Sequence, residues 1–139
     1  MLVKDIMTKN PETLPPNTPI QKVAEEMQKL DCGFMPIATN GKIVGTVTDR
    51  DIAIRATSKG KDPKTTPIEE IMTSRSYYVL ENDDVSLAAE KMCQHQIRRL
   101  IVLDKNKHIS GVVSLGDIAT KFKNHEIDAE IIEEVSEKK

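Results

Sequence analysis

Apolar residues recur at the spacing of one helical face in two segments that lie 65 positions apart. The apolar positions are Ile20, Val23, Ala24, Met27 and Leu30 in the first segment and Val85, Ala88, Ala89 and Met92 in the second. Steps of three and four residues place side chains on one side of a helix, so both segments are predicted to be amphipathic helices. Thr18, followed by Pro19 and Gln21, is the expected N-cap of the first helix, and Asp83 is that of the second.

Two short β-prone runs follow each predicted helix, and a second helical pattern follows the runs. The strands are expected at about residues 34–38 and 43–48 in the first half and at about 99–103 and 109–114 in the second. Asn40-Gly41 lies between the first two strands and is a strong signal for a tight hairpin. The remaining elements are turns at 3–7 and 68–72, short extended pieces at 12–14 and 77–80, and closing helices at about 49–58 and 115–123.

The two halves form an internal repeat. Asp5-Ile6-Met7-Thr8 recurs as Glu70-Ile71-Met72-Thr73, and after one inserted residue Asp51 corresponds to Asp117. One repeat has too little interior to be stable alone, so the two are expected to pack as one α/β domain, of the α+β kind, with pseudo-two-fold symmetry. The predicted parts are repeat 1 (1–58), a linker (59–67), repeat 2 (68–124) and an acidic tail (125–139). The apolar spacing of the tail fits a short amphipathic helix and a solvated end equally well.

Composition and charge argue against several functions. The chain has 139 residues, a net charge of -2 and no tryptophan, so it offers neither a basic field nor an aromatic platform for nucleic acid. No signal peptide is recognisable, and no apolar run reaches the about 20 residues that span a bilayer, so we expect a cytoplasmic protein. Cys32, Cys93 and the three histidines lack metal-ligand spacing, so neither a metal site nor a disulfide framework is expected.

A short stretch that occurs twice, at residues 45–53 and 111–119, is the best candidate for a site. In each copy a glycine lies in a β-prone run that ends in a hydroxyl residue, and an aspartate follows three positions later. The pairs are Thr48 with Asp51 and Ser114 with Asp117. This spacing fits a helix capping box, which would be a structural role. It also fits a nucleotide corner, in which the carboxylate accepts from a ribose diol and the hydroxyl and helix N-terminus bind phosphate. The ligand role is preferred, because the motif occurs at the same place in both repeats.

Together with residues 3–7, 33–37 and 97–104, these stretches resemble a tandem pair of cystathionine-β-synthase (CBS) domains, a Bateman module. The resemblance covers about residues 2–57 and 66–122, which suggests a stand-alone pair without a catalytic domain. It implies a β-α-β-β-α unit in each repeat, a cleft between the repeats and a homodimer. It also implies an adenosine-containing ligand such as AMP, ADP, ATP, S-adenosylmethionine or a dinucleotide.

The resemblance further implies roles for individual residues. The ribose would be held by Asp51 and Asp117, and the phosphate would be contacted by Thr48 and Ser114. The base would be met by the backbone of Thr13 and Tyr78 and by the side chains of Met35 and Pro36.

The two corners differ in their basic residues. Arg98-Arg99 precedes the apolar strand of the second repeat, where the family often carries a basic pair for phosphate, whereas the first repeat has Gly33-Phe34. Successive strand residues face opposite ways, so one arginine could simply point to solvent, and at least one is expected to bind phosphate. Arg50 is a further phosphate candidate, with an exposed place in the first helical turn as the alternative.

The sequence therefore predicts a non-enzymatic regulatory sensor that binds an AMP-, ADP- or ATP-like ligand between its repeats and needs no other cofactor. A nucleophile paired with a base, a metal constellation and a Walker-type loop are not recognisable, which argues against an enzyme. Two alternatives remain: a structural module for dimerisation or protein interaction without a physiological nucleotide, and a sensor of S-adenosylmethionine or a dinucleotide. The sensor also calls for a regulated partner protein, which the sequence does not identify.

Overall fold

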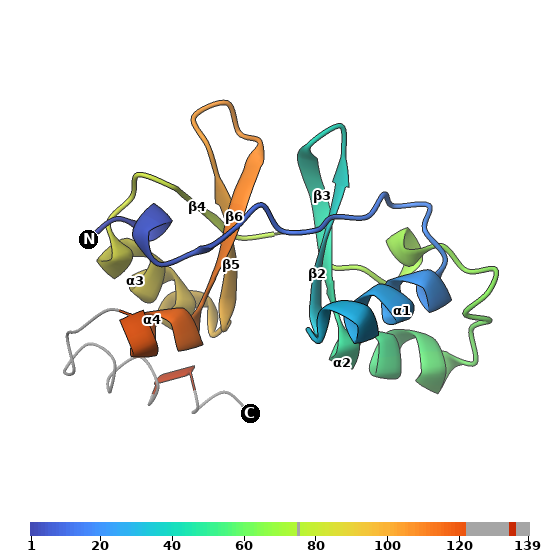
Figure 1. Cartoon of the computed structure of the whole chain (residues 1–139). Coiled ribbons are helices and arrows are strands. Elements are labelled where there is room, and N and C mark those ends of the chain that lie inside the picture. Colours follow the sequence, from blue (N-terminus) through green and yellow to red (C-terminus); the bar gives the residue numbers. More distant parts are fainter. Residues whose placement is uncertain (75, 122–133, 136–139) are drawn as a thin grey trace. The chain divides into compact units, whose positions relative to one another are not determined.

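The structure of the chain is a computed structural model that describes residues 1–74, 76–121 and 134–135 (Figure 1). Helices and strands are mixed along the chain, which confirms the α+β class. The helical elements are η1 (Val3–Asp5), α1 (Ile20–Leu30), α2 (Asp49–Asp51), η2 (Ile52–Ala56), η3 (Thr57–Lys59), η4 (Ile68–Glu70), α3 (Val85–His95) and α4 (Leu115–Lys121). The strands are β1 (Thr8–Lys9), β2 (Phe34–Thr39), β3 (Lys42–Thr48), β4 (Tyr78–Leu80), β5 (Arg99–Leu103) and β6 (Ile109–Ser114). Most of the predicted tail, and residues 122–123 of the predicted closing helix, lie outside the described residues.

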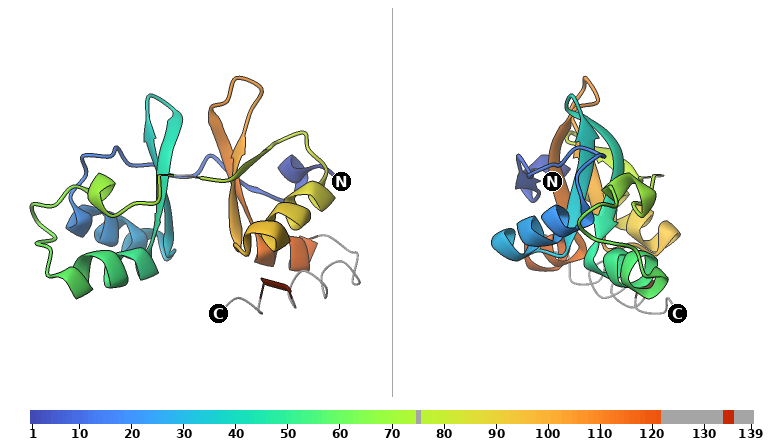
Figure 2. Two further views of the ribbon diagram at one scale, coloured as in Figure 1. Left: turned by 180° about the vertical axis from the view of Figure 1, so that it is seen from behind. Right: turned by 90° about the vertical axis from the view of Figure 1, so that its right-hand side faces the viewer.

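The chain divides into two compact units. Unit 2 consists of Glu12–Ser76, and unit 1 combines Met1–Pro11 with the chain from Tyr77 onward. The first eleven residues open repeat 1 in the sequence but fold with repeat 2, and Figures 1 and 2 show η1 and β1 beside the strands and helices of that repeat. The turn that opens repeat 1 packs into the core of unit 1, and the turn that opens repeat 2 packs into the core of unit 2. The unit boundaries therefore lie later in the sequence than the repeat boundaries.

Unit 1 contains a four-stranded sheet in the order β1-β6-β5-β4. Strand β4 is parallel to β5, and the other neighbouring pairs are antiparallel. Val3 and Ile6 from the N-terminal segment share one hydrophobic core with Leu100, Val113 and Ile118. This core joins the sheet to α3 and α4 and encloses the start of the chain.

Unit 2 repeats this plan with fewer paired residues. Its sheet is the hairpin β2–β3, and single bridges extend it: Leu14 pairs in parallel with Ile37, and Thr73 pairs antiparallel with Thr46. The predicted extended piece at 12–14 is therefore one bridge, whereas the piece at 77–80 forms β4. The shorter pairing has a local cause, because Leu14 is followed by two prolines, which have no N–H to donate.

Residues 3–8 and residues 68–73 are equivalent segments of the two repeats. We call them the crossing segments, because each begins one repeat but folds with the unit built mainly from the other repeat. Each begins with a 3-10 turn, η1 or η4, and buries an isoleucine in the core of its unit: Ile6 in unit 1 and Ile71 in unit 2. Each then lies antiparallel to a strand, β1 beside β6 and Thr73 beside Thr46. A crossing segment thus supplies both core side chains and a sheet edge to its unit.

The strand and hairpin predictions are confirmed. Strands β5 and β6 have the predicted bounds, and β2 and β3 each extend one residue further toward their turn. In that turn Asn40 and Gly41 have φ values of 52° and 79°. Both are left-handed, as the two central residues of a type I′ hairpin turn must be.

The N-cap predicted for α1 is wrong. The helix begins at Ile20, and its N-cap is Pro19, which makes no side-chain capping bond. The Thr18 hydroxyl donates instead to the Pro15 carbonyl at 2.7 Å and closes the turn that precedes the helix. Thr18 therefore lies one position before the N-cap, in the preceding turn and not at the start of the helix.

The N-cap predicted for α3 is wrong by one residue. The cap is Asp84, whose carboxylate accepts from the backbone N–H (2.9 Å) and the hydroxyl (2.8 Å) of Ser86. These two hydrogen bonds to the charged form, the backbone one first, lower the pKa of the Asp84 carboxyl. The predicted cap, Asp83, accepts from the Leu80 N–H at 2.8 Å and closes the turn between β4 and α3.

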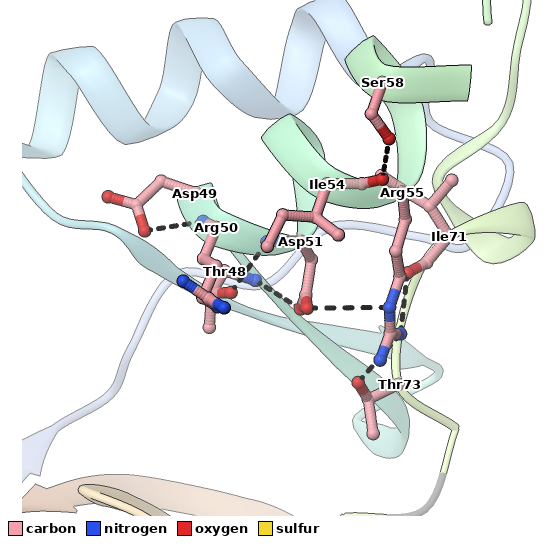
Figure 3. A network of polar contacts seen from close by, with 9 residues as sticks. All are labelled: Thr48, Asp49, Arg50, Asp51, Ile54, Arg55, Ser58, Ile71 and Thr73. Atoms are coloured by element: carbon pink, nitrogen blue, oxygen red, sulfur yellow. Dashed lines mark hydrogen bonds and ion pairs between the residues drawn. The ribbon is translucent and has the colours of Figure 1, made fainter. Parts of the chain in front are cut away.

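The closing helix of repeat 1 has the predicted position but is not one regular α-helix. It starts as α2, continues as the π-helical turn η2 and ends in the 3-10 turn η3. The Ser58 hydroxyl donates to the Ile54 carbonyl across this change (Figure 3). The equivalent element in repeat 2, α4, is α-helical over its described length.

Candidate functional site

The first corner lies where β3 ends and α2 begins, within unit 2. The Thr48 hydroxyl accepts from the Asp51 N–H at 3.1 Å, and the Asp51 Oδ2 accepts from the Thr48 N–H at 2.9 Å (Figure 3). These reciprocal bonds are those of a capping box, so the pair has the structural role that the sequence offered as the alternative to ligand binding.

The second corner, where β6 ends and α4 begins in unit 1, has the same geometry. Asp117 Oδ2 accepts from the Ser114 N–H at 2.9 Å, and the Ser114 hydroxyl accepts from the Asp117 N–H at 3.0 Å. The recurrence of the spacing in the sequence therefore reflects a recurrence of the hydrogen bonds.

The capping bonds use only part of each pair. A carboxylate has about four acceptor positions and a hydroxyl has one proton to donate. Each capping box occupies one position on Oδ2 and a lone pair on the hydroxyl, which leaves Oδ1 and the hydroxyl proton for other partners. The side chains of Asp51 and Asp117 are each 18% exposed, so solvent and solutes reach them. Capping and ligand binding are therefore compatible at both corners.

A cation that the sequence analysis missed faces each of these carboxylates. Arg55 Nε lies 3.8 Å from Asp51 Oδ1, and Lys121 Nζ lies 3.5 Å from Asp117 Oδ1. Both cations follow their aspartate by four residues, the spacing of neighbours on a helix surface. That spacing, repeated in both halves, is the sequence signal that could have identified them.

The same cations also reach the crossing segments. Arg55 Nη1 donates to the Ile71 carbonyl and to the Thr73 hydroxyl, both at 3.2 Å (Figure 3). Lys121 Nζ donates to the Ile6 carbonyl, also at 3.2 Å. Each corner is thus connected to the crossing segment of its own unit through one positively charged side chain.

The glycine in each repeated stretch has a role within the fold. A Cβ on Gly45 would lie 2.9 Å from the Thr73 carbonyl oxygen, and a Cβ on Gly111 would lie 2.8 Å from that of Thr8. Such contacts are too short for real side chains, so glycine is needed where the crossing segment approaches the strand. These glycines therefore permit a close approach of backbone to backbone.

We expect Gly111→Ala to lower the free energy of unfolding by about 1–3 kcal/mol, because the backbone oxygen that its methyl group would meet cannot move without displacing β1. Gly116→Ala is the matched control: its Cβ would meet only the Ser114 hydroxyl, at 3.6 Å. Alanine in place of an exposed helical glycine stabilises by up to about 1 kcal/mol. Urea denaturation measures both variants, and equal stabilities would contradict this role for Gly111.

The predicted arginines lie beside the second corner. Arg99 pairs in register with Ser114 across β5 and β6, and the Arg98 carbonyl accepts from the Leu115 N–H at 2.8 Å. Both arginine side chains are exposed. Arg50, the third basic candidate, is exposed in the first helical turn, and its guanidinium lies apart from the Asp51–Arg55 pair (Figure 3).

The four residues predicted to contact the base differ in their burial and in their contacts. Met35 is 1% exposed in the core of unit 2, and Pro36, the next residue in β2, is also buried. Thr13 is half-buried next to the Leu14 bridge. The Tyr78 carbonyl already accepts from Lys91 Nζ at 2.8 Å. The base contacts implied by the resemblance stay predictions.

The described residues show three further features. Among these residues no group of three or more His, Cys, Asp and Glu side chains is placed to hold a metal ion. His95, for which the sequence gave no ligand role, is half-buried and stacks on Tyr77 with ring centroids 3.6 Å apart. None of the helices in the described ranges is both long and apolar enough to cross a membrane.

A family model described as "CBS domain" matches the chain twice, over residues 3–56 and 68–124. Each match includes one strand–helix corner and the turn that opens its repeat. The two matches together cover most of the chain, which confirms the repeat and the resemblance drawn from the sequence.

Three solved structures are similar to the chain over most of its length. The CBS domain protein PAE2072 from Pyrobaculum aerophilum, complexed with AMP, is 30% identical with a TM-score of 0.80, over 96% of this chain and 99% of that one. The CBS domain pair of protein MJ0100, in complex with 5′-methylthioadenosine and S-adenosyl-L-methionine, is 35% identical with a TM-score of 0.78, over 88% and 95%. Hypoxic response protein I, known from Mycobacterium tuberculosis and solved with two coordinated zinc ions, is 30% identical with a TM-score of 0.77, over 86% and 97%.

Proposed function

The chain belongs to the CBS domain family, with two CBS domains in tandem, and we propose that it is a non-enzymatic regulatory sensor that binds an AMP-like adenine nucleotide at its strand–helix corners. The proposal includes a homodimer, a cytoplasmic location and a regulated partner protein, all three of them expectations from the sequence. The ligand class is supported by the similar structures that contain AMP or S-adenosyl-L-methionine with 5′-methylthioadenosine.

The observation that carries the proposal is the pair of partly used carboxylates. Asp51 and Asp117 are each held by a capping bond on Oδ2, while Oδ1 remains able to accept a hydrogen bond from a ligand hydroxyl. A ribose presents two adjacent hydroxyls, and bonds from these to a fixed carboxylate are of the stronger, charge-assisted kind. The hydroxyl groups of Thr48 and Ser114 can donate their protons to a phosphate oxygen next to that ribose.

S-adenosylmethionine is the second candidate ligand, supported by the MJ0100 complex at 35% identity. The aspartates alone do not separate the two ligands, because both contain adenosine. The exposed arginines beside Ser114 favour a phosphate, since a guanidinium is permanently charged and matches phosphate oxygens in its geometry. We therefore place AMP-like nucleotides first.

The proposal is tested by thermal denaturation of nucleotide-free protein with adenosine, AMP, ATP, S-adenosylmethionine, NAD and GMP. A ligand that binds only the folded protein adds about 2.7 kcal/mol at a hundredfold excess over its dissociation constant, so weak binders are visible. We expect stabilisation by adenine compounds and none by GMP. No stabilisation of folded protein by any of them would reject the sensor and favour the interaction module.

We expect Arg98→Ala with Arg99→Ala to weaken AMP binding by about 10-fold or more, because a charge-assisted bond to phosphate contributes about 1.5–3 kcal/mol. Adenosine, which has no phosphate, should bind the double variant and the unaltered protein equally well. Isothermal titration calorimetry with both ligands measures the difference. An equal loss for AMP and adenosine would show that the arginines support the fold and not the phosphate.

A further inference from the structure

The carboxylate, a cation and the crossing segment are connected in the same way in both units. In unit 2 the connection runs from Asp51 through Arg55 to Ile71 and Thr73, as Figure 3 shows. In unit 1 it runs from Asp117 through Lys121 to Ile6. The cation is an arginine in a π-helical turn in unit 2 and a lysine in an α-helix in unit 1. In both units it still contacts the aspartate on one side and the crossing segment on the other.

Stability alone explains this arrangement poorly. The Arg55 and Lys121 side chains are 48% and 50% exposed, and ion pairs at such positions contribute only about 0–1 kcal/mol. The contact distances suggest orientation as the purpose. At 3.8 Å and 3.5 Å the cations attract Oδ1 without closing a short hydrogen bond, so the lone pairs of Oδ1 stay open to a ligand.

We propose that Arg55 and Lys121 are positioning residues of the two ligand corners: each orients Oδ1 of its aspartate for the ligand and makes affinity at that corner depend on the docked crossing segment. This inference rests on the proposed function, because it assigns Oδ1 to the ligand. Along the chain each crossing segment leads within a few residues into the other unit, at Pro11 and at Ser76. Ligand binding at a corner thereby stabilises the segment through which the units are covalently joined.

The two corners are not equally constrained. Arg55 has two hydrogen bonds to its crossing segment, whereas Lys121 has one, so the Arg55 side chain is fixed by more bonds than that of Lys121. Since lysine performs the role in unit 1, Arg55→Lys is a conservative replacement at the first corner. Arg55→Met keeps a long side chain but removes the charge and the donors. Lys59→Met removes one positive charge from the exposed turn η3 and is the matched control.

The test is a titration of ¹⁵N-labelled full-length protein with adenosine, followed by amide NMR signals. Signals of Thr48 and Asp51 report the first corner, and those of Ser114 and Asp117 report the second. We expect Arg55→Met to weaken adenosine binding at the first corner by about tenfold and at the second by less than about twofold. Lys121→Met should do the reverse, and Arg55→Lys and Lys59→Met should stay within about threefold of the unaltered protein.

One further readout separates positioning from a merely structural role, and a second tests the docking of the crossing segment. In an Asp51→Asn background Arg55→Met should cause no additional loss, because Arg55 acts through that carboxylate. In ligand-free protein the Thr46 and Thr73 amides, which bond each other's carbonyls at 2.9 Å and 2.8 Å, should exchange faster in Arg55→Met. Equal loss with and without the Asp51 carboxylate, or unchanged affinity, would overturn the inference. Failure of the unaltered protein to bind adenosine or any other adenine compound would instead reject the proposed function, and with it this use of Oδ1.

Discussion

Replacing Asp117 by asparagine is expected to weaken AMP binding at its corner by about 10- to 100-fold, since a hydrogen bond to a charged group contributes about 1.5–3 kcal/mol. The asparagine oxygen can still accept the Ser114 N–H, which Asp117 Oδ2 accepts at 2.9 Å, so the cap is retained. The substitution removes the charge and replaces Oδ1 by a donor, and these are the features assigned to the ribose. Asp51→Asn makes the same change at the first corner.

Isothermal titration calorimetry of AMP against each variant and the double variant measures this effect. Asp62→Asn removes the same charge from an exposed turn and is expected to bind AMP like the unaltered protein. The melting temperature without ligand should change little in every variant, because the capping bonds persist. Full affinity in the double variant would refute the role of the carboxylates, and loss in one single variant only would show that one corner is used.

Replacing Ile6 by alanine is expected to lower the free energy of unfolding of unit 1 by about 2–5 kcal/mol, the range for removing a large apolar side chain from a packed core. Ile6 is 2% exposed and packs with Leu100 and Ile118, although more than ninety positions separate it from them in the chain. Ile71→Ala is the equivalent change in unit 2. Leu30→Ala is the control: this residue is 41% exposed, so its replacement should lower the free energy of unfolding only slightly.

The tyrosines make the two units separable in this experiment. The chain has no tryptophan, and its two tyrosines, Tyr77 and Tyr78, both lie in unit 1. Tyrosine fluorescence during urea denaturation therefore reports unit 1, while circular dichroism reports helices of both units. Ile6→Ala should lower the fluorescence midpoint, and a midpoint that stays unchanged would contradict the placement of the N-terminal segment in this core.

Local patterns in the sequence predicted most of the elements. The bounds of β5 and β6 were predicted to the residue, and the hairpin was predicted at Asn40-Gly41, because alternation and turn chemistry depend on adjacent residues. The caps of α1 and α3 were missed by one residue. At α3 two adjacent aspartates could serve as the cap, and the preceding turn uses Asp83. At α1 the preceding turn uses Thr18, and the helix starts after Pro19 without a side-chain cap.

The strand–helix corners were also accessible from the sequence. Their capping boxes link residues three positions apart, so the pairs Thr48–Asp51 and Ser114–Asp117 could be recognised without the fold. The sequence favoured ligand binding over helix capping as the role of these pairs. The structure shows the capping and a second carboxylate oxygen that the cap does not use.

By itself the sequence determined the repeat, the family, the order of elements and the two corners, because each of these is encoded by residues close together in the chain. Only the tertiary structure decided that the first eleven residues complete unit 1 and that Gly45 and Gly111 admit a crossing segment. It also showed that Arg55 and Lys121 connect the corners to those segments. The bonds concerned join residues 16, 18 and 115 positions apart, and no local pattern specifies a partner at such separations.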